Sequence, residues 1–326
     1  MKTPQEKLAA LVETGIHFDL SNEEYHASGG LSSTGVRKLM NSISDWKHHQ
    51  QAEFKESKSM RIGTLFHTCV LEPARFAAEC AIHPPVDIGA MNWRHVAAAK
   101  MLVDGAHIEA IADKCNCKPA TAEKYLAEPD VRALIEFYGE YGADFQPVDP
   151  DELDTVERMR DRLHAHPRVK SGLLTGGLSE VSFYARREDY GAPIVKCRAD
   201  YLLDLGDAWL VVDLKGTGKK ADLDSFQSTV MNWRYDVQAA WYSDVIELAT
   251  GKPVDAVVFA AVEFDAPHHA GLHLIDDAAL DCGRWGTNRR PGYHHALKNW
   301  EAYQSNPEIF DGYSDQIETL SLPGWA

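Results

Sequence analysis

The sequence lacks long hydrophobic runs. No segment approaches the stretch of about 20 apolar residues that spans a bilayer. The opening segment 1–13 is polar and has no apolar core of the kind found in signal peptides. We therefore expect a cytoplasmic protein that does not engage a membrane.

Cysteine is scarce and scattered. The six cysteines are Cys69, Cys80, Cys115, Cys117, Cys197 and Cys282. Only Cys115 and Cys117 lie close together, and one residue separates them, whereas paired cysteines in zinc sites are separated by about two to four. We expect reduced thiols, mostly with structural roles.

The sequence has fewer positively charged than negatively charged residues. The 33 lysines and arginines face 49 aspartates and glutamates, which gives a formal net charge of -16. Most of such a surface repels the phosphates of nucleic acid, which argues against broad nonspecific affinity for nucleic acid. A local basic channel remains compatible with this charge.

The chain is long enough, at 326 residues, for one large domain with insertions or for two smaller domains. Three segments, 178–186, 194–204 and 208–214, have the composition of successive strands, with turns at Gly191 and Gly206. A helical segment at 235–248 and a strongly apolar strand at 255–264 follow them. This order predicts an α/β fold in which helices flank a central mixed sheet.

Helices are expected in the N-terminal part. Ser32 or Ser33 can accept hydrogen bonds from the first backbone N–H groups of a helix that passes through Leu39. A second helix carries 63–71 and stops at Pro73, because proline disrupts a helix interior.

The block 92–128 is also helical but has a different pattern. Segments 106–114 and 119–126 have the lengths of a small helix-turn-helix, and Pro119 is well placed at a helix start. Two interpretations stay open. The block is either an insertion that contacts DNA or a helical hairpin packed on the side of the main domain.

The most informative stretch is Asp213-Leu214-Lys215. Residues two apart in a strand project from the same face, so Asp213 and Lys215 point together beside Asp200, which ends the preceding strand segment. Magnesium prefers oxygen ligands and typically takes about one or two protein carboxylates. Asp200 and Asp213 suit that role, with the backbone carbonyl of Leu214 as a further ligand. Lys215 is placed to orient a water molecule, to help deprotonate it, or to offset charge on a phosphate.

Four further residues can serve this group. Glu180 begins the first strand, His67 lies on the upstream helix, and Gln238 and Tyr242 share one helix face because they are four apart. Each also has a plain structural alternative. A single histidine on an apolar helix, for example, is often a core residue.

Two basic stretches could contact phosphate. The turn 216–220 contains Lys219 and Lys220, and the helical segment 152–164 contains Arg158, Arg160 and Arg162. The alternative for both is a solvated surface, which is the usual role of mixed-charge segments.

The order of these motifs resembles a known family. Gly63-x-x-x-His67, Asp200, Asp213-x-Lys215 and Gln238-x-x-x-Tyr242 are similar to the motif series of the PD-(D/E)XK nuclease superfamily, in its RecB-like branch. Within that branch the chain resembles RecE-type exodeoxyribonuclease VIII of phages and prophages. The segments that carry this resemblance are Tyr25-His26, 31–35, 63–67, 197–200, Val262-Glu263 and Pro267. The block 92–128 has no counterpart in this resemblance.

The resemblance implies a domain organisation and roles for the site residues. It implies an N-terminal helical part of the nuclease domain at 1–91, a helical insertion at 92–130 and a nuclease core at 131–326. The residues with implied catalytic roles are Asp200, Asp213, Lys215 and Glu180. His67 is implied to be a further metal ligand or a phosphate contact. Gln238 and Tyr242 would contact substrate or hold the geometry of the site, and Lys219 and Arg198 would contact substrate.

The resemblance also implies an activity. It is that of a Mg²⁺-dependent exonuclease, with Mn²⁺ as an alternative cation, that degrades one strand of linear duplex DNA from its 5′ end. The remaining 3′ single strand would pass to a strand-annealing protein of the RecT type for recombination. A ring-shaped homotetramer around DNA would reconcile an acidic exterior with a basic channel.

Two alternatives remain. A Cas4-like nuclease shares these motifs but holds an iron–sulfur cluster with four cysteines, and since only Cys282 follows Lys215, we expect no such cluster. A nuclease-derived DNA-binding module without catalysis would need a broken site, whereas Asp200, Asp213 and Lys215 are all present.

Overall fold

The chain divides into two compact units. The computed structural model describes residues 14–18, 20–52, 57–79, 86–143, 145, 148–309, 311–313, 316–317 and 319–320. The first unit comprises Met1–Ser57, Ala165–Glu263 and His269–Ala326, and the second comprises Lys58–His164 and Phe264–His268.

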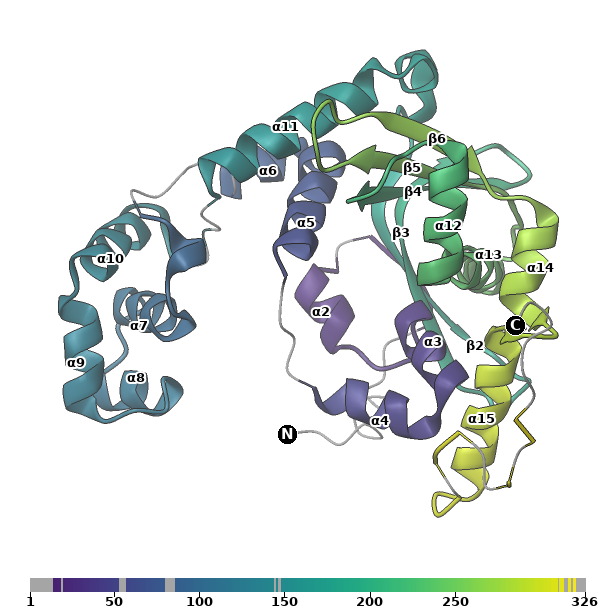
Figure 1. Cartoon of the computed structure of the whole chain (residues 1–326), viewed down its shortest axis with the longest axis horizontal. Helices are drawn as coiled ribbons and strands as arrows, with labels where there is room; N and C mark the ends of the chain where they lie inside the picture. Colours follow the sequence, from purple (N-terminus) through teal and green to yellow (C-terminus); the bar gives the residue numbers. More distant parts are fainter. Residues whose placement is uncertain are drawn as a thin grey trace. The chain divides into compact units, whose positions relative to one another are not determined.

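A six-stranded sheet forms the centre of the first unit (Figure 1). Its strands, in spatial order, are β1 Gly15–His17, β2 Leu178–Arg186, β3 Ile194–Asp204, β4 Trp209–Thr217, β5 Val254–Glu263 and β6 Ala270–Leu274. Neighbours pair antiparallel except β4 and β5, which run parallel. The expected mixed sheet flanked by helices is confirmed.

The main core lies between this sheet and helix α13, Tyr235–Thr250. Alternate residues of β2 and β3, among them Phe183 and Cys197, are fully buried in this core together with Trp241 of α13. Residues of the other parity, such as Ser182 and Arg198, point to the opposite face because side chains alternate along a strand. Ser182 and Arg198 therefore lie on the face of these two strands that is turned away from α13.

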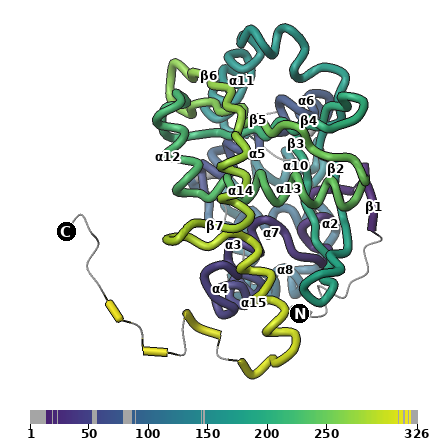
Figure 2. Tube along the Cα trace, turned by 90° about the vertical axis from the view of Figure 1, so that its right-hand side faces the viewer, coloured from purple at the N-terminus to yellow at the C-terminus, as the bar shows by residue number. Residues whose placement is uncertain are grey.

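The remaining helices of the first unit surround this core. They are α2 Asn22–Ala27, α3 Ser33–Asn41, α4 Ile43–Gln51, the π-helical segment Val169–Leu173, α12 Leu223–Trp233, α14 Asp277–Trp285 and α15 Tyr293–Ser305, and a two-stranded sheet, β7 Gly286–Thr287 with β8 Arg290–Pro291, joins the last two helices. Ser32, rather than Ser33, caps α3 by accepting a hydrogen bond from the N–H of Gly35 at 3.2 Å. Figure 2 shows α14 in front of α13 and leading to α15.

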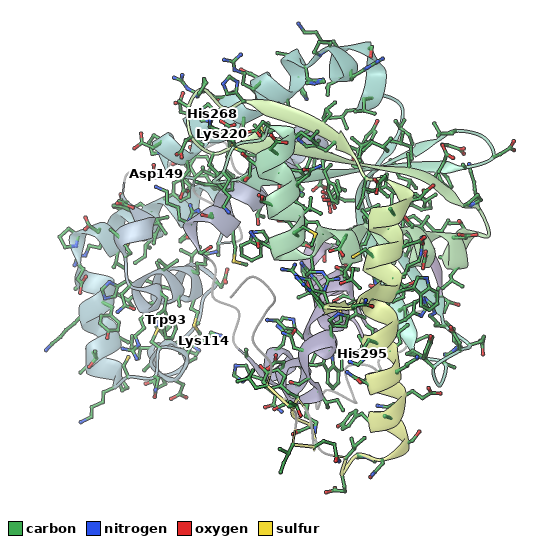
Figure 3. All side chains as sticks on the ribbon, turned by 45° about the vertical axis from the view of Figure 1, so that its right-hand side comes forward. Trp93, Lys114, Asp149, Lys220, His268 and His295 are labelled. Carbon is green, nitrogen blue, oxygen red and sulfur yellow. The ribbon has the colours of Figure 1, made fainter. Side chains whose placement is uncertain are left out.

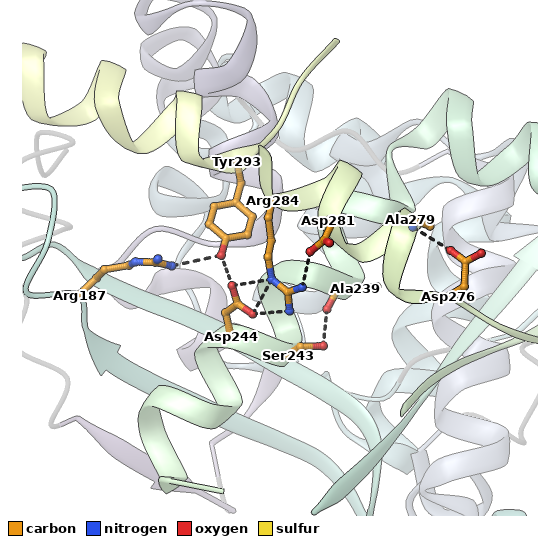
Figure 4. A network of polar contacts seen from close by, with 9 residues as sticks. All are labelled: Arg187, Ala239, Ser243, Asp244, Asp276, Ala279, Asp281, Arg284 and Tyr293. Carbon is orange, nitrogen blue, oxygen red and sulfur yellow. Dashed lines mark hydrogen bonds and ion pairs between the residues drawn. The ribbon is translucent and has the colours of Figure 1, made fainter. Parts of the chain in front are cut away.

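A polar network joins α13 to α14 and α15 (Figure 4). The carboxylate of Asp244 on α13 accepts hydrogen bonds from the guanidinium of Arg284, the shortest at 2.8 Å, and from the hydroxyl of Tyr293. Arg187, which follows β2, donates to the same hydroxyl at 3.3 Å. The network fixes the C-terminal helices on α13, the helix that faces the sheet.

In the described part of the second unit, the regular secondary structure is helical. The helices are α5 Lys58–Leu71, α6 Pro73–Glu79, the 3₁₀ turn Ile88–Ala90, α7 Trp93–Val103, α8 Ile108–Lys114, α9 Pro119–Ala127, α10 Pro129–Tyr141 and α11 Pro150–Ala165. This unit is larger than the expected helical block 92–130. Within this unit, Arg61 of α5 pairs with Glu152 of α11 at 2.9 Å.

The described part of the chain contains no disulfide and no membrane-spanning helix. Five cysteines, Cys69, Cys115, Cys117, Cys197 and Cys282, carry free thiols, and Cys80 lies outside the described residues, as does the segment 1–13. Among the described helices, none is both long enough and apolar enough to cross a membrane.

Candidate active site

Three carboxylates stand in one row across the centre of the sheet. The β3–β4 register pairs Tyr201 with Val212, which places Asp200 opposite Asp213. The β2–β3 register pairs the two neighbours of Glu180 with the two neighbours of Asp200, so these acids are opposite each other as well. A carboxylate oxygen of Glu180 and one of Asp200 lie within 4.8 Å of each other.

Asp200 closes the end of the β3–β4 ladder. The ladder's described pairs end at Tyr201 and Val212, and beyond them the backbone N–H of Leu214 donates to the Asp200 carboxylate at 2.7 Å. Asp200 is buried, so this bond satisfies a backbone donor that water cannot reach. The backbone carbonyl of Leu214, which was predicted to be a further metal ligand, accepts a hydrogen bond from the Lys215 ammonium at 3.4 Å.

Asp213 and Lys215 form an ion pair. Both residues lie within β4, because this strand continues to Thr217. The Asp213 side chain is almost fully buried, and the Lys215 ammonium lies 5.0 Å from the centre of the Tyr235 ring. Burial alone would lower the pKa of Lys215, but Asp213, Asp200 and Tyr235 together raise that pKa above its ordinary value. Lys215 is therefore a cation near neutral pH.

Helix α13 presents Gln238 and Tyr242 to these residues. The Gln238 amide donates to the Asp213 carboxylate at 3.2 Å, which fixes the position of that carboxylate. Burial, followed by the charges of Asp213 and Asp200, raises the pKa of Tyr242 well above its ordinary value. Gln238 thus contacts a predicted metal ligand directly, whereas the substrate contacts of Gln238 and Tyr242 stay predictions.

Arg198, an expected substrate contact, lies on β3 and makes its described hydrogen bonds within the protein, so a contact with substrate stays a prediction. Arg198 is buried, and its guanidinium donates to the hydroxyl of Ser182 at 2.8 Å and to the backbone carbonyl of Leu20 at 2.7 Å. It also lies 4.0 Å from the Glu180 carboxylate. These contacts make Arg198 a positioning residue for Glu180, since its donors are directed at the protein itself.

The conformation of Glu180 is unusual. Its φ of 53° lies in the left-handed region, where a residue with a Cβ is strained by roughly 1–2 kcal/mol. Beyond Glu180 the strand pairs regularly with β3 from Val181 to Arg186. The left-handed geometry re-aims the Glu180 side chain beside Asp200, and strain of this kind is typical of functional sites.

Two further predicted residues, Lys219 and His67, lie on other parts of the chain than the carboxylate row. Lys219 is exposed just beyond β4, and its backbone N–H donates to the Thr217 hydroxyl at 3.0 Å. His67 belongs to α5 of the second unit. Contacts of both with metal or substrate stay predictions.

Arg37 is a charged neighbour of the site that sequence reasoning missed. It lies on α3, and its guanidinium donates to the backbone carbonyl of Trp233 at 2.7 Å. Burial lowers the pKa of Arg37, while Tyr242, Tyr235 and Asp213 act in the opposite direction. The local sequence carries no signal for this role, because Arg37 approaches Asp213 only through the packing of α3 on α13.

The donor set fits a hard divalent cation. Glu180, Asp200 and Asp213 supply oxygen donors only, and Mg²⁺ and Mn²⁺ prefer carboxylate and water oxygens. A cation would also offset the cost of bringing three acids together in a partly dry site. The donor set of the site therefore suits a hard divalent cation.

Comparison with known proteins agrees with this geometry. A family model described as a PDDEXK-like domain of unknown function (DUF3799) matches residues 32–288. No curated protein matches the chain in sequence. The match spans β2 to β6 and every residue of the carboxylate row.

Two solved structures share a distant likeness. A candidate exonuclease from Eubacterium rectale is 12% identical with a TM-score of 0.49, over 94% of this chain and 96% of its own. The structure of SSO0001 is 8% identical with a TM-score of 0.25, over 85% of this chain and 87% of its own. Neither likeness bears on function, and the family match alone identifies the chain. The chain belongs to the family of PDDEXK-like domains of unknown function (DUF3799).

Proposed function

We propose that this protein is a metal-dependent nuclease that hydrolyses phosphodiester bonds of DNA. The observation that carries the proposal is the row of Glu180, Asp200 and Asp213 across three strands, with the Lys215 cation paired to Asp213. Membership of the PDDEXK-like family supports it.

The residues divide the chemistry between them. Glu180, Asp200 and Asp213 would hold Mg²⁺ or Mn²⁺, which when bound neutralises phosphate charge and lowers the pKa of water. Lys215, held as a cation by its neighbours, stabilises negative charge that develops on the phosphate. Gln238 keeps the Asp213 carboxylate in place. His67 remains a predicted further ligand.

The finer proposal is an exonuclease that acts on the ends of linear duplex DNA. It degrades the strand with the 5′ end and leaves a 3′ single strand for an annealing protein of the RecT type. A ring-shaped homotetramer is part of the same proposal. Its support is the resemblance of the motif series to RecE-type exonucleases, and no contact in the structure encodes the direction.

The test uses duplex DNA labelled separately at its 5′ and 3′ ends, with a covalently closed circle of the same sequence as the substrate without ends. The proposal predicts early release of the 5′ label with Mg²⁺, no release with chelator, and an intact circle. Cleavage of the circle at the same rate would contradict the exonuclease, and early release of the 3′ label would contradict the direction. A folded protein that cleaves neither DNA with Mg²⁺ or Mn²⁺ would overturn the nuclease itself.

A further inference from the structure

Helices α7, α8 and α9 of the second unit share a small core of their own. Its buried members are Ala98, Ile111, Ala112, Cys115 and Ala122. Most of these side chains are small, so the three helices approach one another closely. This group is therefore a compact three-helix element built around the α8–α9 pair.

The turn between α8 and α9 is sharply defined. Asn116 adopts a left-handed conformation with φ 50°, which asparagine tolerates better than most residues with a Cβ. The N–H of Cys117 donates back to the carbonyl of Ala112 at 2.9 Å, and Pro119 opens α9. Two short helices joined by a turn of about three or four residues are the geometry of a helix-turn-helix.

The outer face of α9 is exposed. Lys118, Ala120 and Lys124 are all exposed to solvent, whereas Ala122 faces the small core. Within the second unit this face of α9 is therefore accessible to a partner molecule.

The chemistry of this face suits duplex DNA. Lys118 and Lys124 can contact phosphates, and the small side chains of Ala120 and Thr121 allow a helix to approach base edges in the major groove. The exposed acidic residues of the same helices are Glu109 and Asp113 on α8 and Glu123 on α9, and Glu128 after α9 pairs with His95 at 3.6 Å.

A third lysine and an aromatic residue border the same element. Lys114 is exposed at the end of α8, and the next residue, Cys115, donates to the backbone carbonyl of Arg94 at 3.4 Å. Trp93, the first residue of α7, is 57% exposed (Figure 3). The start of α7 therefore lies against the turn, so that Trp93 and Lys114 extend the surface beside α9.

We propose that α8 and α9 form a helix-turn-helix that binds duplex DNA, with α9 in the major groove and Lys118 and Lys124 on phosphates. The inference shares its ligand with the proposed nuclease but needs neither metal nor a DNA end. Its failure can therefore be separated from a failure of the nuclease.

The test measures the binding of the full chain to a fluorescent duplex whose ends are closed by hairpin loops, in chelator. The Lys118→Ala/Lys124→Ala double variant should bind at least about tenfold more weakly. The slope of log affinity against log salt should fall by about 2, because each lost phosphate contact removes roughly 0.9. The matched control, Lys298→Ala on the exposed face of α15, should bind as the wild type does.

A second variant keeps the proposal falsifiable. Ala120→Glu adds charge and bulk to an exposed position outside the small core, so it should abolish binding and leave the thermal transition unchanged. Binding by either α9 variant at wild-type affinity would overturn the proposal. The proposal would also be overturned if the wild-type protein bound only duplexes with open ends, or bound no duplex at all. A protein would then be the remaining candidate partner for this face of α9.

Discussion

The carboxylate of Asp200 accepts a hydrogen bond from the backbone N–H of Leu214 at 2.7 Å. The same carboxylate lies in the row formed with Glu180 and Asp213. A carboxylate has room for about four acceptor contacts, so Asp200 can close the β3–β4 ladder and still offer an oxygen to a cation. The Asp200 side chain thus has two roles, since it accepts the hydrogen bond that ends the β3–β4 pairing and belongs to the proposed metal site.

Two substitutions of Asp200 should separate these roles. Asp200→Asn keeps an oxygen that can accept from Leu214 but removes the negative charge, so cleavage should fall at least about 100-fold with little loss of stability. Asp200→Ala leaves the buried N–H without its acceptor and should also lower the free energy of unfolding by about 1–3 kcal/mol. Denaturant unfolding beside cleavage assays checks both. Equal stability of the two variants would contradict the role of this hydrogen bond.

A substitution of Glu180 should lower activity without lowering stability. Glu180→Gly removes the side chain and also relieves the strain of the left-handed backbone, so the free energy of unfolding should stay constant or rise by about 1 kcal/mol. Cleavage should fall at least about 100-fold because a metal-site carboxylate is gone. Glu180→Ala, which keeps the strain, is the control and should be less stable than Glu180→Gly. Retained cleavage in both variants would remove Glu180 from the site.

Gln238 should act through Asp213. Gln238→Met keeps the length of the side chain but removes the amide that donates to Asp213, so the Mg²⁺ concentration needed for half-maximal cleavage should rise about 10–100-fold. Saturating Mg²⁺ should restore most of the rate. Gln227→Met, at an exposed position of α12, is the matched control. An unchanged Mg²⁺ requirement would show that the Gln238 contact does not orient the carboxylate.

His294 should make the fold sensitive to acid. It is buried on α15, and its ring is stacked on Trp285 at 3.8 Å between centroids. Burial, followed by the charge of Arg187, lowers the pKa of His294 to about 4. Below pH 6.5 the unfolded chain therefore binds a proton that the folded chain does not, and stability is lost as the pH falls toward 4.

The corresponding experiment compares the free energy of unfolding at pH 7.5 and pH 5. From the His294 pKa alone, the wild type should lose about 2 kcal/mol more than His294→Phe over this interval, because phenylalanine keeps the stacking but does not titrate. His295→Phe alters an exposed neighbour on the same helix and should keep the wild-type slope. Identical slopes for wild type and His294→Phe would contradict the lowered pKa.

The sequence predicted the strands well because their patterns are local. Segments 178–186 and 194–204 coincide with β2 and β3, whose inward residues alternate along each strand. The third strand was expected to end at Leu214 but continues to Thr217, because its last residues pair in parallel with β5. A partner strand some forty residues away leaves no mark on a local pattern.

The residue types of the site were evident in the sequence, whereas its supporting contacts were not. The spacing of Asp213 and Lys215 follows from strand periodicity, and that of Gln238 and Tyr242 follows from helix periodicity. The approach of Arg37 and the turning of Arg198 toward Ser182 depend on packing between distant segments. Such contacts are fixed by tertiary structure, so a single sequence does not display them.

The most direct test of the central claim is the cleavage rate of linear duplex DNA as a function of Mg²⁺ for the wild type and Asp213→Asn. The account predicts Mg²⁺-dependent cleavage by the wild type and a loss of at least about 100-fold in a variant with an unchanged circular dichroism spectrum. Cleavage by Asp213→Asn at the wild-type rate, or wild-type cleavage that persists in chelator, would contradict it.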